Sequence, residues 1–287
     1  MTMTDKKPTV ALIYDFDGTI SPGNMQEYAF IPTVGTTNKE FWDDCEDLAI
    51  SQDADPILSY MAKMIHYARS KGLSLKRSAF HESGRHIRLF EGVKEWFGRI
   101  NAYGESKGVN VVHYINSSGI QEIIEGTSIA HEFRKIYACT FLYDVDGVAY
   151  WPGVAINYTN KTQFVYRINK GVLDIANDVD LNRSMPDDSK RVPFTNMIYV
   201  GDGLSDVPCM KMMKAYGGCA IAVYQDNNRA KVEELLCGDR VDFIFPADYR
   251  KGGRLDKTVH DLIKKMAISD ELTKENARQL RELGVRN

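Results

Sequence analysis

The sequence predicts an α/β fold in which a doubly wound parallel sheet carries an inserted domain made only of helices. Two observations support this prediction. Short, continuously apolar runs recur along the chain, as is typical of parallel strands covered on both faces. Helical stretches separate these runs, and strands that alternate with helices indicate a parallel sheet. The stretch 22–88 breaks the alternation, because it contains helical patterns and no convincing strand.

The apolar run at residues 10–14 is expected to be a central strand of the sheet. Similar runs predict the other strands, and the stretches between them predict helices. The expected strands lie at 109–115, 197–200 and 220–223, and the expected helices at 93–106, 119–125, 161–175, 206–215, 228–236 and from 256 onward. The main domain would then comprise residues 1–21 and 89–287, with a polar loop at 182–190.

The inserted stretch, residues 22–88, has its clearest helix after Asp55. Asp55 is suited to cap the first turn, and Pro56 fits the first helical position. Apolar residues then recur on one face of this helix, as expected for packing. We interpret the insert as a helical cap domain.

Composition narrows the classes of partner. The net charge is −3, with 36 basic and 39 acidic residues, which gives no electrostatic footprint for nucleic acid or an anionic membrane. The five cysteines are widely spread and form no CxxC pair, so neither a zinc site nor a disulfide framework is expected. No apolar run is long enough for a signal peptide or a membrane span. We therefore expect a cytoplasmic protein that binds a small molecule.

Two aspartates directly follow the first predicted strand, in Asp15-Phe16-Asp17-Gly18-Thr19. Residues two apart in a strand face the same way, so Asp15 and Asp17 are expected to point into the crevice at the carboxyl edge of the sheet, where open α/β folds bind ligands. Gly18 lets the chain turn sharply, and Thr19 offers a hydroxyl and an amide near an anion. The alternative interpretation is a solvated Asp-Gly turn.

A second acidic segment, Gly201-Asp202-Gly203-Leu204-Ser205-Asp206, follows the predicted strand at 197–200. A turn with Asp206 as a helix cap is the simpler interpretation, but it does not explain why two core strands each deliver two carboxylates to one edge. Four clustered acids raise one another's pKa values unless a cation compensates them. Carboxylate oxygens suit Mg²⁺ best, so the sequence predicts a magnesium site.

Two further residues are candidates for binding phosphate. Ser117 follows the predicted strand at 109–115 and precedes a predicted helix, so a hydroxyl and free helix amides would meet there. Lys161 stands at the start of another predicted helix, where a cation is unfavourable without a compensating anion. Lys170 is the alternative lysine. Taken alone, Ser117 is a helix cap and Lys161 a solvated lysine.

These motifs occur in the order and strand contexts of the four motifs of the haloacid dehalogenase superfamily, and the chain most resembles its phosphoserine-phosphatase-like branch. The resemblance implies that Asp15 is the nucleophile and that Asp17 is the general acid and base. It implies that Asp15, the carbonyl of Asp17 and Asp202 hold Mg²⁺. The remaining implied residues are Ser117 and Lys161, which bind phosphate, Asp206, which positions Lys161 or a metal-bound water, and the supporting residues Thr19 and Gly203.

The implied activity is hydrolysis of a small phosphate monoester through an aspartyl phosphate. Asp17 argues against the dehalogenase branch, which lacks an acid at that position. Two alternatives stay open: a phosphotransferase that uses the same intermediate, and a catalytically idle protein that binds a phosphorylated ligand.

The substrate is expected to be a small phosphorylated metabolite chosen by the insert. Phosphoserine phosphatases place an acidic residue nine positions after the nucleophile, and here that position is Asn24, with Glu27 three residues later. Basic residues of the 85–88 segment, Arg85 and Arg88, are the other candidates for specificity. We assign no catalysis to His113, expected in the core or at its edge, or to the DxDG segment that begins at Asp144, where a hairpin turn is expected.

Overall fold

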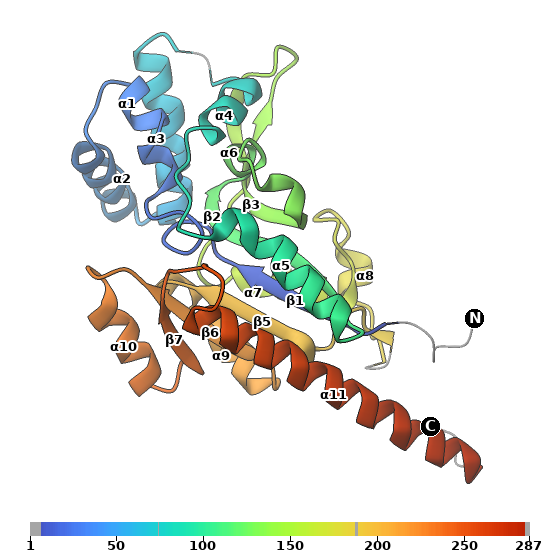
Figure 1. Ribbon diagram of the computed structural model, residues 1–287. Coiled ribbons are helices and arrows are strands. Elements are labelled where there is room, and N and C mark those ends of the chain that lie inside the picture. Colours follow the sequence, from blue (N-terminus) through green and yellow to red (C-terminus); the bar gives the residue numbers. More distant parts are fainter. Residues whose placement is uncertain (1–6, 74, 187–188, 285–287) are drawn as a thin grey trace.

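The computed structural model describes residues 7–73, 75–186 and 189–284 of the chain. Within them, a seven-stranded sheet has the strand order β4-β3-β2-β1-β5-β6-β7 (Figure 1). Neighbouring strands run parallel, except that β4 is antiparallel to β3. The predicted class, a parallel α/β sheet, is confirmed. The strands are β1 (Thr9–Tyr14), β2 (Asn110–Ile120), β3 (Phe133–Tyr143), β4 (Ala149–Val154), β5 (Met197–Gly201), β6 (Cys219–Tyr224) and β7 (Phe243–Pro246).

Helices cover both faces of the sheet. α5 and α11 pack on each other in front of it in Figure 1, whereas α7 and α9 contact each other behind it. All six residues of β1 are buried, as expected for a strand flanked by two neighbours and covered on both faces. The helices of the main domain are α5 (Val93–Ser106), α6 (Gln121–Glu125), α7 (Lys161–Lys170), α8 (Asp178–Asn182), α9 (Val207–Ala215), α10 (Arg229–Cys237) and α11 (Arg254–Glu282), with short 3-10 turns at Ala130–Glu132, Phe194–Asn196 and Leu204–Asp206.

Three helix boundaries differ from the prediction by two residues or more. The helix expected from residue 256 begins at Arg254. The helix expected at 161–175 ends at Lys170, because Gly171 adopts a left-handed conformation with φ of 77° and closes it. The helix expected from residue 119 begins at Gln121, because β2 continues through Ile120. Neither β7 nor the first part of β3 was predicted from the sequence. The predicted polar loop at 182–190 lies partly outside the described residues.

The insert folds into helices, as predicted. They are α1 (Phe30–Thr33), α2 (Asn38–Gln52), α3 (Pro56–Ser70) and α4 (Arg77–Gly84), preceded by a 3-10 turn, η2 (Met25–Glu27). In Figure 1 these helices lie in the upper part of the view, above β1. Asp55 caps α3, since its Oδ1 accepts hydrogen bonds from the amides of Ile57 and Leu58. The domain boundaries at residues 22 and 88 remain predictions.

The β3–β4 hairpin extends to the insert and pairs with it. The amide of Ala149 donates to the carbonyl of Leu75, and the amide of Arg77 donates to the carbonyl of Gly147. The tip is the turn expected around Asp144, whose Oδ1 accepts hydrogen bonds from the amides of Asp146 and Val148. This second DxDG segment is therefore a structural turn that braces the insert.

A buried chain of hydrogen bonds joins β1 and β2. Trp96 Nε1 donates to Tyr14 Oη at 2.9 Å, Tyr14 Oη lies 3.1 Å from His113 Nδ1, and His113 Nε2 lies 2.9 Å from Asn101 Oδ1. Burial lowers the pKa of His113 to about 3, so this imidazole is neutral at physiological pH. His113 is the core histidine that the sequence predicted.

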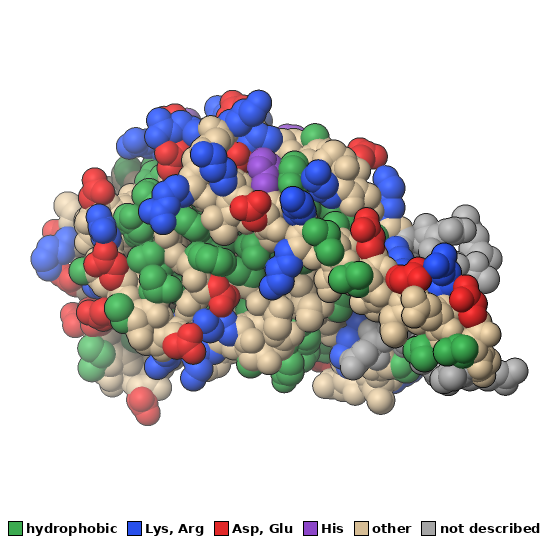
Figure 2. Space-filling view, turned by 60° about the horizontal axis from the view of Figure 1, so that its bottom comes forward, with side chains coloured by type: hydrophobic (Ala, Val, Ile, Leu, Met, Phe, Trp, Pro, Cys, Tyr) green, Lys and Arg blue, Asp and Glu red, His purple; other side chains and the backbone are tan. Residues whose placement is uncertain are grey.

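The described surface shows charges of both signs. On the face drawn in Figure 2, basic and acidic side chains are interspersed, and the described residues there form no continuous basic area. In the described part of the chain, no helix combines the length and the apolar character needed to cross a bilayer.

α4 and α6 approach each other through two glycines. A Cβ atom at Gly84 would lie 2.1 Å from the carbonyl oxygen of Ile123, and a Cβ atom at Gly126 would lie 2.0 Å from the carbonyl oxygen of His81. Backbone atoms cannot move aside as a flexible side chain can. These two glycines therefore allow the insert to pack directly on the main domain.

We expect Gly84→Ala to lower the free energy of unfolding by about 1–3 kcal/mol, because the added methyl group overpacks the contact between α4 and α6. Gly98→Ala is the matched control, since Gly98 lies in α5 with open space where its Cβ atom would be. That variant should be neutral or stabilised by up to about 1 kcal/mol. Denaturant unfolding measures both, and equal stability of the two variants would contradict the close packing.

Candidate active site

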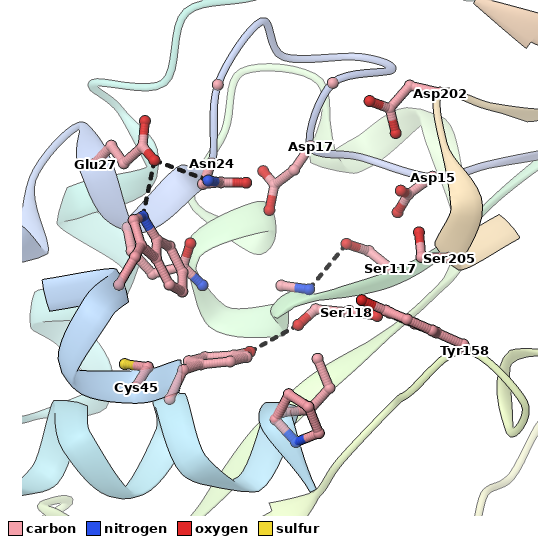
Figure 3. A pocket seen from close by; sticks show the side chains of 18 of the residues that line it. Asp15, Asp17, Asn24, Glu27, Cys45, Ser117, Ser118, Tyr158, Asp202 and Ser205 are labelled. Carbon is pink, nitrogen blue, oxygen red and sulfur yellow. Dashed lines mark hydrogen bonds between the residues drawn. The ribbon is translucent and has the colours of Figure 1, made fainter. Parts of the chain in front are cut away.

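The candidate site lies where β1 and β5 end. Asp15 directly follows β1, and its amide donates to the carbonyl of Val200 in β5 at 2.9 Å. Asp202 directly follows β5. Carboxylate oxygens of Asp15, Asp202 and Asp206 all lie within 4.8 Å of one another. The structure thus brings together the acids of both motifs, and Figure 3 shows Asp15, Asp17 and Asp202 around one cavity.

Two glycines make this approach possible. Gly18 has a φ of 74°, and a Cβ atom there would lie 2.1 Å from Asp202 Oδ2. A Cβ atom at Gly201 would lie 2.4 Å from Asp206 Oδ2. Any side chain at either position would push a carboxylate away. Gly18 is therefore needed both for the turn that the sequence predicted and for the contact between the two motifs.

Lys161 lies beneath the carboxylates and is fully buried. Its Nζ donates to Asp206 Oδ1 at 2.8 Å and lies 3.2 Å from Asp15 Oδ1. Asp206 also accepts hydrogen bonds from Tyr199 Oη at 2.7 Å and from the amide of Asp202. Both oxygens of Asp206 are thus engaged in positioning Lys161 and the Asp202 backbone.

Burial and mutual repulsion act on the carboxyl groups. Burial and the Asp206 carboxylate raise the pKa of Asp15 to about 6, although Lys161 opposes the shift. Burial and the Asp15 carboxylate raise the pKa of Asp202 to about 8. For Lys161, burial lowers the pKa, but Asp15 and Asp206 more than compensate and raise it. One lysine does not neutralise the group, and the oxygen-only donor set fits a divalent cation such as Mg²⁺.

Asp17 has a different environment. Its Oδ1 accepts a hydrogen bond from the amide of Met25 at 3.0 Å, at the start of the insert. Burial, followed by the Asp15 carboxylate, raises the pKa of Asp17 well above its usual range. A raised pKa favours the protonated form of this carboxyl group, and a general acid must be protonated before it can donate.

Ser117 lines the same cavity, but not at a helix start as expected. It lies within β2, and its Oγ accepts a hydrogen bond from the amide of Gly119 at 3.0 Å. The amide of Ile120 points to Met25 Sδ. The expected free helix amides are therefore absent at residues 119 and 120. Two hydroxyl groups of this strand line the cavity, those of Ser117 and Ser118, and Ser118 Oγ is buried without a hydrogen-bond partner among the described residues.

The other predicted residues lie in several places. Thr19 is buried in the turn, its amide donates to the carbonyl of Phe16, and it does not line the cavity. The expectation that Thr19 lies near an anion is therefore not supported. Gly203 follows Asp202 in an extended conformation. Lys170 Nζ donates to the carbonyls of Leu181 and Arg183, so Lys161 is the lysine at the site.

The cavity has a volume of about 850 Å³ and is closed by the insert on one side. Asn24 and Glu27 line it, as predicted for specificity. Arg85 and Arg88 do not line it: Arg85 pairs with Glu82 at 3.0 Å and borders a separate groove beside the β3–β4 hairpin. Of the residues predicted to set specificity, only those in the first part of the insert line the cavity, and their role remains a prediction.

Sequence reasoning missed several lining residues. Trp42 and Tyr60 come from α2 and α3, and Gln225 follows β6. Gln225 Nε2 donates to the carbonyl of Pro22, a contact between residues far apart in sequence. The aromatic residues resemble ordinary packing positions of amphipathic helices, so no signal in the sequence separates them from the core.

Comparison with known proteins supports the fold. No family model matches the chain. An uncharacterized protein of Borreliella burgdorferi is 29% identical over 284 residues, 88% of this chain and 96% of that protein. A substrate-bound phosphoserine phosphatase structure has a TM-score of 0.56 at 14% identity, over 86% of this chain and 97% of the other. The structure of a haloacid dehalogenase family hydrolase from Salmonella enterica serovar Typhi has a TM-score of 0.54 at 16% identity, over 79% of this chain and 66% of that one. The expected resemblance is confirmed at the level of the fold.

We expect Lys161→Met to lower the free energy of unfolding of the metal-free protein by about 3–5 kcal/mol, because it leaves buried carboxylates without their cation. Lys170→Met is the matched control and should cost far less, since among the described residues Lys170 Nζ donates to two carbonyl groups and pairs with no carboxylate. Denaturant unfolding in a chelator tests this. Equal losses in the two variants would show that Lys161 does not compensate the acids.

Proposed function

We propose that this chain, which has the fold of haloacid dehalogenase-type hydrolases, is a magnesium-dependent phosphatase that hydrolyses a small phosphate monoester. The single observation that carries the proposal is the group formed by Asp15, Asp202 and Lys161 at the carboxyl ends of β1 and β5. Asp15 beside Lys161 is suited to in-line attack, and the neighbouring Asp17, whose pKa is raised, is suited to protonating the leaving group.

Asp15 is the proposed nucleophile. Its Oδ1 contacts Lys161, which orients the carboxylate and leaves Oδ2 for attack on phosphorus. Attack forms an O–P bond, breaks the bond to the alcohol oxygen and yields an aspartyl phosphate. Asp17 gives its proton to the leaving oxygen. The Asp17 carboxylate then takes a proton from water as that water attacks phosphorus, which releases inorganic phosphate and restores Asp15.

The cation has a defined set of candidate ligands. The Asp15 and Asp202 carboxylates and the Asp17 carbonyl would hold Mg²⁺, whereas Asp206 is engaged by Lys161 and Tyr199. When bound, Mg²⁺ supplies positive charge that neutralises the phosphoryl group and the carboxylates. Ser117 Oγ, which lines the cavity, would donate to a phosphoryl oxygen, and Lys161, buried against Asp15, would contribute its positive charge.

The same geometry would serve a phosphotransferase, so the acceptor decides between the two activities. We also propose a cytoplasmic location, which the five free cysteines support, because a reducing compartment keeps thiols free.

We expect release of inorganic phosphate from an aryl phosphate to stop after chelation and to return with Mg²⁺ but not with Ca²⁺. Ca²⁺ accepts looser and larger coordination, which would misplace the attacking oxygen of Asp15. A colorimetric phosphate assay measures this, with and without added alcohols to detect transfer. Full activity after exhaustive chelation would exclude the metal-dependent mechanism, and no activity with any phosphate ester would favour an idle binding protein.

A further inference from the structure

All charged side chains that line the cavity are acidic. They are Asp15, Asp17, Glu27, Glu46 and Asp202. Among the described residues, no lysine, arginine or histidine lines the cavity, and Lys161 lies buried beneath Asp15. Lys161, Ser117 and a cation can account for the phosphate end of a ligand. Nothing in the lining compensates the acids at the other end.

Glu27 is a fixed anion at that other end. Its Oε1 accepts hydrogen bonds from Asn24 Nδ2 at 2.8 Å and from Trp42 Nε1 at 2.9 Å (Figure 3). These bonds hold the carboxylate in place without neutralising it. Within the described part of the chain, no hydrogen bond or ion pair reaches Oε2. The half-buried carboxylate therefore keeps one oxygen free to accept hydrogen bonds from a ligand.

Gln26 provides a second, independent observation. Its side chain lines the cavity and is 2% exposed, yet its Oε1 accepts no hydrogen bond from any described residue. A buried acceptor without a donor costs about 1–3 kcal/mol. A ligand that donates hydrogen bonds would remove this cost. A ligand that donates hydrogen bonds would therefore satisfy both Glu27 and Gln26, and positive charge on that ligand would be attracted to the Glu27 carboxylate.

The position of Glu27 indicates which part of a bound ligand would lie next to it. In Figure 3, Asn24 lies between Glu27 and Asp17, on the side of Asp17 away from Asp15. Asp17 is the proposed acid for the leaving oxygen, so this side of the cavity receives the alcohol part of the ester. The rings of Trp42 and Tyr60, with centroids 6.1 Å apart, also line this region and can attract a cation.

We propose that the site selects phosphate monoesters whose alcohol part carries a protonated primary amine and no carboxylate, with the ammonium group donating to Glu27 Oε2 and Gln26 Oε1. This inference rests on the proposed phosphatase function and names its substrate class. A primary ammonium fits better than a quaternary one, because it carries N–H groups that can donate to both acceptors and a quaternary ammonium carries none. A carboxylate on the same alcohol would meet acids only, which disfavours phosphoamino acids.

Binding of non-hydrolysable phosphonates to the wild-type protein with Mg²⁺ tests the inference separately from activity. Isothermal titration compares 3-aminopropylphosphonate with butylphosphonate, which replaces the ammonium group by a methyl group. It also compares the first ligand with 2-amino-4-phosphonobutanoate, which adds a carboxylate. We expect the aminopropyl ligand to bind at least about tenfold more tightly than either, since a charge-assisted hydrogen bond contributes that much.

Glu27→Gln should remove most of the preference for the ammonium ligand over butylphosphonate. Asp47→Asn is the matched control: it removes one negative charge from an exposed position of α2 outside the cavity and should keep the preference. Equal binding of the amino and alkyl phosphonates by the wild type would overturn the inference, even if aryl phosphates are hydrolysed. Equal loss in both variants would reduce it to an effect of net charge. A preference without any hydrolysis would instead overturn the proposed function.

Discussion

The structure depends on clustering three carboxylates at the ends of two neighbouring strands, where the buried Asp15 and Asp206 contact one lysine and Asp202 is half-buried beside them. Asp15, Asp202 and Asp206 repel one another, and Lys161 offsets only part of that repulsion. The backbone is adapted to the cluster, since Gly18 and Gly201 are the positions where a side chain would collide with a carboxylate. Burial then raises the pKa of the Asp15 and Asp202 carboxyl groups. A cation that relieves the repulsion would also prepare the site for phosphoryl chemistry.

The insert completes this site. The amide of Met25 binds Asp17, and Met25 Sδ meets the amide of Ile120 in β2, so the first turn of the insert fixes the proposed acid against the sheet. Glu27 follows two residues later and is held by Trp42 from α2. The residue proposed to act as the acid and the residue proposed to select the substrate are therefore held by segments only a few residues apart. The close contact between Gly84 and α6 anchors the far end of the same insert.

The sequence predicted the parts of the fold that depend on local pattern. Buried strands such as β1 are continuously apolar, and motifs that follow them are placed by the sheet itself. β7 was missed because it is a four-residue edge strand with mixed exposure. The placement of Arg85 and Arg88 failed because it depends on how α4 packs, which no local pattern encodes. The same holds for Gln225 and Pro22, which meet only in the folded chain. Ser117 was correctly predicted to lie at the carboxyl edge of the sheet. The prediction that it begins a helix was wrong, because β2 continues past it.

The central claim is that Asp15 carries a phosphoryl group during turnover, and the most direct measurement is the mass of the trapped intermediate. Asp17→Asn removes the base that activates water, and an aryl phosphate supplies a leaving group that needs no acid. Acid quenching of this variant during turnover, followed by peptide mass spectrometry, should find one added phosphoryl group on the peptide that contains Asp15. The group should be missing when Asp15 is also replaced by Asn. A phosphoryl group on another residue, or turnover without any phosphorylated protein, would contradict the account.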